Sequence, residues 1–104
     1  MHLTIFEYRL RDDADADAYG ELSRRMHAIV EGDPSYGYLG GETLQREDGS
    51  RVALEWFGAG DGVKRWARNP DHRVAQRRGR DEFYAWYRVR TLEVEREMLF
   101  GDTD

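Results

Sequence analysis

The order of two hydrophobic periodicities constrains the fold of this chain more than any other feature of its sequence. Apolar and polar residues alternate, as in β-strands, over residues 2–10, 36–47, 51–57 and 85–98. Segments with helical periodicity separate the first strand from the second and the third strand from the fourth. This βαββαβ order predicts an α+β, ferredoxin-like fold, in which an antiparallel sheet carries two helices on one face.

Length and composition limit the organisation and the partners of the protein. A chain of 104 residues is expected to form one domain, residues 1–104, with a tail over residues 99–104. It contains no cysteine, so we exclude disulfides and thiolate chemistry and expect a reducing, cytoplasmic setting. No apolar run approaches the roughly 18 residues of a membrane span. The formal charge of −5 argues against nucleic acid as the main partner.

Local signals set the ends of the first expected helix. Aspartates at several positions over residues 12–17 are typical of a helix start, where carboxylates accept hydrogen bonds from free N–H groups. We interpret them as capping residues and predict no metal site. The helix is expected to run to about Glu31, where Gly32 and the following Asp33-Pro34 end it.

Glycines in the second strand and after it indicate irregular backbone. Asp48-Gly49 predicts a hairpin turn between the second and third strands. Gly40-Gly41 indicates a bulge, or a close approach of backbone or ligand. This pair is not a phosphate-binding loop, because the required spacing and the following helix are missing.

The second long helix carries the most informative feature of the sequence. A short helical turn over residues 63–68 precedes it, Asn69 is its expected cap and Pro70 its first residue, and it ends near Phe83 or Tyr84. The side that should pack carries His72, Ala75, Gln76, Gly79 and Phe83. The other side carries arginines, Arg80 included, and should face solvent. An imidazole and an amide on a packed stripe require partners, a ligand or a water-filled cavity.

The expected arrangement leaves one face of the sheet uncovered. Both helices lie on the same side, and the opposite face has apolar residues with nothing in this chain to cover them. A second copy that packs sheet against sheet about a two-fold axis would cover this face. We therefore expect a homodimer that associates through the sheet face.

Residues 54–96 contain a distinctive pattern: a strand ending in tryptophan, a second tryptophan ten residues later, then N-P-D-H, A-Q-x-x-G-R, an aromatic pair and a final strand. In this pattern the chain resembles the antibiotic biosynthesis monooxygenase family of dimeric α+β barrel proteins. Elsewhere the similarity is one of element order and size. The resemblance implies a dimeric α+β barrel with a cavity between sheet and helices in each subunit. It also implies a cofactor-independent oxygenase for phenolic, anthrone-type or quinol-type aromatics, or a protein that binds and degrades haem.

The haem-degrading branch of this family offers a specific comparison. It is similar in using an asparagine near the end of the first strand, a tryptophan, and a haem-ligating histidine ten residues after that tryptophan. The corresponding places in this chain hold Tyr8, Trp66 and Gln76, so two of the three differ. His72 lies one helical turn from the expected ligand, on the same face. Haem binding through His72 therefore stays open as an alternative.

A cofactor-free oxygenase needs an aromatic pocket, a base and hydrogen-bond donors for the substrate anion. We predict His72 as the base, because an unperturbed pKa near 6.5 suits proton abstraction at neutral pH. Trp66 and Gln76 complete the predicted catalytic group. The predicted substrate-binding residues are Tyr8, Phe6, Trp56, Asn69, Phe83 and Tyr84. The side on which Arg88 and Arg90 lie stays open.

These residues also have structural interpretations. The two tryptophans can be core residues, His72 can cap its helix or pair with a carboxylate, and Gln76 can bond the backbone near Gly79. We interpret His27, beside the apolar stripe of the first helix, as a boundary residue. A third hypothesis is a non-enzymatic ligand-binding or structural dimer, for which a fully packed interior would be the signature.

Overall fold

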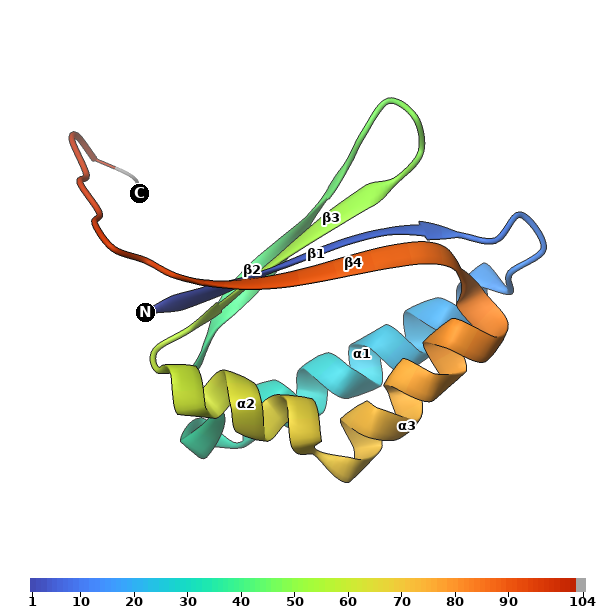
Figure 1. Ribbon diagram of the computed structural model, residues 1–104, viewed down its shortest axis with the longest axis horizontal. Helices are drawn as coiled ribbons and strands as arrows, with labels where there is room; N and C mark the ends of the chain where they lie inside the picture. The colour runs from blue at the N-terminus through green and yellow to red at the C-terminus, as the bar shows by residue number, and fades with distance from the viewer. Residues whose placement is uncertain (103–104) are drawn as a thin grey trace.

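The computed structural model describes residues 1–102, which form a four-stranded antiparallel sheet with three α-helices on one of its faces (Figure 1). The strands are β1 (His2–Leu10), β2 (Tyr38–Gln45), β3 (Arg51–Phe57) and β4 (Tyr84–Glu93). The helices are α1 (Ala16–Gly32), α2 (Gly60–Arg68) and α3 (Pro70–Arg78), with a 3₁₀ turn, η1 (Pro34–Tyr36), and a π turn, η2 (Gly79–Phe83). The strand order β2-β3-β1-β4 confirms the ferredoxin-like α+β fold.

Capping side chains begin α1 and α3 where the sequence predicts. The Asp15 carboxylate accepts a hydrogen bond from the N–H of Ala18 at 3.0 Å. The Asn69 side chain accepts bonds from the N–H groups of Asp71 and His72, and Pro70 follows as the first helical residue. These caps fix the direction in which α3 leaves the corner after α2, and therefore the position of its first turn over the sheet.

The boundaries of two strands, β2 and β4, differ from the expectation. The second strand begins at Tyr38, because Tyr36 belongs to the 3₁₀ turn after α1. The fourth strand ends at Glu93, and the chain beyond it leaves the sheet (Figure 1). Within the predicted tail, residues 99–102 lie outside any helix or strand, and residues 103–104 are outside the described part of the chain.

The turn expected over residues 63–68 is a full helix, α2, that begins at Gly60. Its glycines argue against a helix on propensity alone. Close packing explains the glycine at position 62, because a Cβ there would overlap the carbonyl oxygen of Tyr36. Helix α2 therefore packs backbone against backbone on η1. None of the helices within residues 1–102 is long and apolar enough to cross a bilayer.

Gly62→Ala is expected to lower the free energy of unfolding by about 1–3 kcal/mol, the usual cost of overpacking. At an open helical site the same change would raise stability, by up to about 1 kcal/mol. Gly20→Ala in α1 is the matched control, because a Cβ there meets only the flexible Arg24 side chain, at 3.3 Å. Urea unfolding of both variants measures the difference, and equal stabilities would contradict the close contact of α2 with η1.

Alternation along the strands gives the sheet a helix-facing side and an outer side. The helix-facing side carries Thr4, Phe6, Tyr8, Ala53, Glu55, Phe57, Tyr87, Val89 and Thr91. The outer side carries Leu3, Ile5, Glu7, Val52, Leu54, Trp56, Arg88, Arg90 and Leu92. The Arg88 guanidinium donates to the buried Glu7 carboxylate at 2.9 Å, and Arg46 donates to the other oxygen. Arg88 and Arg90 therefore lie on the outer side of the sheet and do not face the helices.

The packed core lies toward the α2 end of the layer between sheet and helices. Val30 of α1, Tyr36 of η1 and Phe57 of β3 form a buried cluster. Tyr38, Val63 and Trp66 pack against this cluster as half-buried residues. Since Trp66 reaches this core from α2, its indole is held in place beside the start of α3.

Candidate functional site

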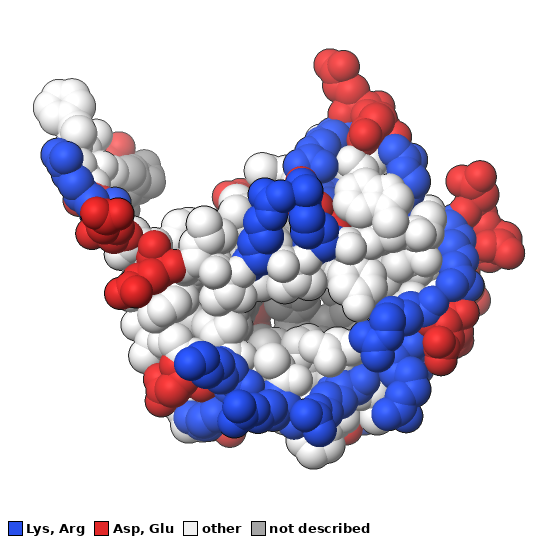
Figure 2. All heavy atoms as spheres, viewed as in Figure 1, with Lys and Arg blue, Asp and Glu red and all other residues white. Residues whose placement is uncertain are grey.

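A cavity of about 440 Å³ lies between the helix-facing side of the sheet and the helices. Ligand sites in proteins typically measure about 300–1,000 Å³ and have apolar, aromatic walls with a few polar groups. Figure 2 shows a hollow between β4 and the helices α2 and α3, with Lys and Arg side chains gathered around it. Tyr87 and Val89 of β4 line the cavity and are still 37% and 52% exposed. The cavity is therefore open along this edge strand.

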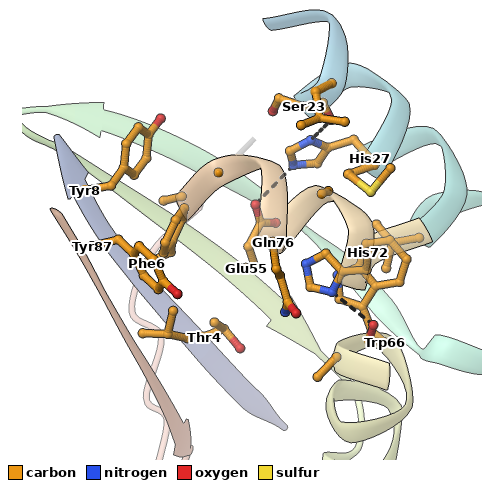
Figure 3. A pocket seen from close by; sticks show the side chains of 18 of the residues that line it. Thr4, Phe6, Tyr8, Ser23, His27, Glu55, Trp66, His72, Gln76 and Tyr87 are labelled. Atoms are coloured by element: carbon orange, nitrogen blue, oxygen red, sulfur yellow. Dashed lines mark hydrogen bonds and ion pairs between the residues drawn. The ribbon is translucent and has the colours of Figure 1, made fainter. Parts of the chain in front are cut away.

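His72 lies at the cavity wall in the first turn of α3, stacked on the indole of Trp66. The two ring centroids are 4.3 Å apart and the ring planes differ by 11°. The Nδ1 atom of His72 lies 3.0 Å from the carbonyl oxygen of Trp66. Because a carbonyl only accepts hydrogen bonds, Nδ1 carries the proton, and Nε2 of the neutral ring is an acceptor. Figure 3 shows this second edge of the ring directed toward Gln76 and the cavity.

Burial lowers the pKa of His72 below its ordinary value, and the hydrogen bond to the Trp66 carbonyl opposes this effect only in part. The imidazole is therefore neutral at physiological pH, with its acceptor nitrogen on the cavity side. A neutral imidazole in an apolar cavity can take a proton from a bound molecule. Within residues 1–102, no group of three or more His, Cys, Asp or Glu side chains could hold a metal ion.

Most of the predicted site residues meet at this cavity. It is lined by the predicted catalytic and binding residues His72, Trp66, Gln76, Tyr8, Phe6, Phe83 and Tyr84. The stripe that the sequence predicts to pack, which runs from α3 into η2, also lines it in full. Arg80 departs from the predicted solvent face: it lines the cavity, and its guanidinium donates to the Tyr87 hydroxyl at 3.3 Å. The wider π turn η2 contains Arg80, and a π turn changes the direction of the side chains within it.

Two predicted substrate-binding residues lie elsewhere. Trp56 pairs with Leu3 and lies on the outer side of the sheet, because it is out of phase with the helix-facing residues of β3. Asn69 uses its side-chain oxygen to cap α3, and its amide nitrogen donates to the Tyr36 hydroxyl at 2.8 Å. Trp56 and Asn69 therefore lie outside the cavity that the other predicted residues line, and their contact with a substrate stays a prediction.

Aromatic side chains form the wall opposite His72. Tyr8 is only 5% exposed, so its hydroxyl does not reach the surface. The hydroxyls of Tyr19 and Tyr84 lie 3.0 Å apart. Burial raises the pKa of Tyr84 to about 12 and also raises the pKa of Tyr19. Both hydroxyls therefore stay protonated at neutral pH, and this wall is uncharged.

The sequence predictions do not include a second polar group in the cavity wall. The Nε2 atom of His27 lies 3.1 Å from one carboxylate oxygen of Glu55, and Nδ1 lies 2.9 Å from the Ser23 carbonyl oxygen. The Tyr38 hydroxyl donates to the other Glu55 oxygen at 2.5 Å. His27, interpreted from the sequence as a boundary residue, thus lines the cavity. The signal that could have found this group is the Gly40-Gly41 pair, because Gly41 lies opposite Glu55 in the sheet.

The hydrogen bond to Glu55 is the main cause that raises the pKa of His27, to about 9. The unfolded chain has a histidine pKa near 6.5, so this ion pair stabilises the fold fully below about pH 6.5 and not above about pH 9. We expect the free energy of unfolding to fall as the pH rises through this interval, and to fall less in His27→Gln. The effect is modest because the His27 side chain is 42% exposed. Urea unfolding at a series of pH values measures it, and identical pH dependence in both proteins would contradict the ion pair.

Known proteins resemble this chain in sequence and in fold. The uncharacterized protein YqjZ of Bacillus subtilis (strain 168) is 32% identical over 84 residues, which cover 81% of this chain and 72% of YqjZ. No model of a protein family matches the sequence.

The structural matches have lower sequence identity. SnoaB, a cofactor-independent oxygenase from Streptomyces nogalater, has a TM-score of 0.73 at 12% identity, over 93% of this chain and 95% of SnoaB. A crystal structure of an antibiotic biosynthesis monooxygenase has a TM-score of 0.73 at 12% identity, over 90% of this chain and 98% of that protein. At these identities the similarity concerns the fold. The chain belongs to the same family as YqjZ, and it has the fold of the antibiotic biosynthesis monooxygenases.

Proposed function

We propose that this protein is a cofactor-independent monooxygenase that oxidises a small aromatic substrate of the phenol, anthrone or quinol type. The observation that carries the proposal is His72, a neutral imidazole with its free nitrogen on the side of a largely apolar cavity. The fold shared with SnoaB, described as a cofactor-independent oxygenase, supports it. A non-enzymatic dimer is expected to have a fully packed interior, whereas this protein has a cavity of about 440 Å³.

The proposed reaction uses the substrate itself as the reductant of oxygen. His72 Nε2 removes a proton from the substrate, and the resulting electron-rich anion adds to dioxygen to form a peroxide. The peroxide then loses water: one oxygen atom stays in the new carbonyl group, the other leaves as water, and the two hydrogens of an anthrone methylene end in that water. Trp66 fixes the ring of His72 by stacking, and Gln76 supplies an amide beside it. The aromatic walls shield the anion from water on their side of the cavity, which is open along β4.

Oxygen uptake with a panel of anthrones, naphthols and hydroquinones tests the proposal. The purified protein is first treated with a chelator, so that adventitious metal does not contribute. We expect saturable oxygen consumption and formation of one quinone per oxygen molecule with at least one substrate class. Uptake no greater than that of buffer with every member of the panel would reject the oxygenase.

Haem binding through His72 is the second candidate, and one observation favours it. A metal-ligating histidine usually donates its other N–H to a carbonyl or carboxylate, as Nδ1 of His72 donates to the Trp66 carbonyl. His72 would then hold the iron, beside Gln76 at the ligand position of the haem-degrading branch. Titration with haem, followed by the Soret band, separates the candidates. A sharp, saturable band that is lost in His72→Ala would favour haem, whereas no specific band would favour the oxygenase.

We further propose that the protein works as a homodimer that associates through the outer side of the sheet. Leu44 and Leu92 on this side are 50% and 45% exposed, and Leu54 lies between them. Leu54→Lys is expected to convert the dimer to a monomer in sedimentation, because it places a charge in an apolar contact. Val74→Lys, at a site on α3 that is 51% exposed, should leave the dimer intact. A wild-type protein that sediments as a monomer would reject this proposal.

A further inference from the structure

The cavity has a second polar side, which the proposed base does not use. Glu55 enters it from β3 and contacts His27 of α1 and Tyr38 of β2. Figure 3 shows His27 and Glu55 joined by a hydrogen bond, with Gln76 and His72 further along the same cavity. A ligand in this cavity that contacts His72 therefore also lies within a space that contains a carboxylate.

Hydrogen-bond accounting shows which member of this group can bind a ligand. Both nitrogens of His27 face atoms that only accept, the Ser23 carbonyl and the Glu55 carboxylate, so both carry protons and the ring is a cation. His27 has no nitrogen left for a ligand. Glu55 accepts one bond on each oxygen, from His27 and from Tyr38. An ionised carboxylate has about four acceptor positions, so about two remain on a side chain that lines the cavity.

The sequence makes room for this carboxylate at a specific place. Gly41 of β2 pairs with Glu55, and a Cβ at Gly41 would overlap the Glu55 carboxylate and the Leu54 carbonyl oxygen. The bulge between Tyr38 and Gly40 shifts the register just before this pair. The Gly40-Gly41 pair therefore allows the Glu55 side chain to lie over β2, where Tyr38 and His27 hold it.

We propose that Glu55 is a ligand-binding residue that accepts a hydrogen bond from a hydroxyl group of an aromatic ligand. The ligand then carries one hydroxyl for Glu55 besides the group that reacts at His72, as in a naphthalenediol or a hydroxyanthrone. A carboxylate repels an aromatic acid, and an ether in place of the hydroxyl leaves Glu55 without a donor. The choice of an oxidisable diol rests on the proposed function, whereas the hydrogen bond to Glu55 does not.

Isothermal titration calorimetry with 1,5-dihydroxynaphthalene and with 1,5-dimethoxynaphthalene tests this inference. Wild-type protein is expected to bind the diol about 10–100-fold more tightly, as for a hydrogen bond to a charged group. Glu55→Gln should reduce this preference to about threefold or less. Tyr38→Phe removes a hydroxyl from the same group but keeps the carboxylate, so it should retain the preference. Circular dichroism confirms that each variant is folded.

Equal affinity of the wild type for the two probes, or no binding of either, would overturn the inference, and this measurement needs no variant. A preference that survives in Glu55→Gln, or that disappears in Tyr38→Phe alone, would also overturn it. The hydroxyl site at Glu55 and the proposed oxygenase activity can be rejected independently of each other. A Glu55-dependent preference without oxygen uptake on any substrate would retain the hydroxyl site and remove the oxygenase. Oxygen uptake with an unchanged preference in Glu55→Gln would do the reverse.

Discussion

His72→Ala is expected to lower the turnover number on an aromatic substrate by about 10²–10⁴-fold, the usual contribution of a general base. The imidazole is the neutral proton acceptor that the structure places beside the cavity with one nitrogen free. The Michaelis constant should change little, because the aromatic walls that bind the substrate stay in place. An oxygen electrode measures both constants once a substrate has been identified.

Arg73→Ala is the matched control, because Arg73 is the next residue of α3 and lies exposed on its other side. It should retain wild-type turnover. The pH profile of the wild type gives an independent check: since burial lowers the pKa of His72, activity should stay constant at neutral pH and fall only below about pH 6.5. Full turnover in His72→Ala would exclude His72 as the base. A loss of activity that, as the pH is lowered, already begins above neutral pH would exclude it as well.

Phe83→Ala is expected to lower the free energy of unfolding by about 3–5 kcal/mol, the usual cost of deleting a buried phenylalanine ring. Phe83 is 2% exposed at the end of η2, with its ring edge-on to Tyr19 at a centroid distance of 5.5 Å. The guanidinium carbon of Arg78 lies over the same ring, 5.4 Å from its centroid. Such a loss is a large fraction of the roughly 5–15 kcal/mol by which domains are stable.

Phe100→Ala deletes the same ring at a site that is 93% exposed, so it is the matched control. Its effect should stay within about 0.5 kcal/mol, as for most surface substitutions. Urea denaturation at a single pH compares the three proteins. A loss below about 1 kcal/mol for Phe83→Ala would mean that Phe83 is not part of a packed wall, because a ring deleted from such a wall leaves a cavity.

The fold was predictable because it depends on periodicities that are local in the sequence. The alternation of β1 and the stripe of α3 each follow from a few neighbouring residues, and both are confirmed. The side of β3 that meets the helices was not predictable in this way. A period of two shows that Trp56 and Leu54 share one side and Glu55 the other, but not which side the helices cover. This ambiguity is the reason why the sequence alone does not place Trp56 on the outer side of the sheet.

The rest of the site depends on contacts between segments far apart in the chain. His27 and Glu55 are 28 residues apart, and nothing near either residue indicates the other. Asn69 shows a different limit: its role as a helix cap is a correct local prediction, and this role occupies the side-chain oxygen that substrate binding would also need. A polar side chain with a strong local partner is therefore a weak candidate for a ligand contact.

The stacking of Trp66 on His72 also couples the ionisation of the imidazole to an optical signal. A protonated imidazole in van der Waals contact with an excited indole accepts an electron from it and quenches its emission, whereas a neutral imidazole quenches far less. Trp86 pairs with Arg9 and Trp56 pairs with Leu3, both on the outer side of the sheet, so neither shares this neighbour. The protein thus contains a fluorescent reporter of its own base, which can be read without a substrate.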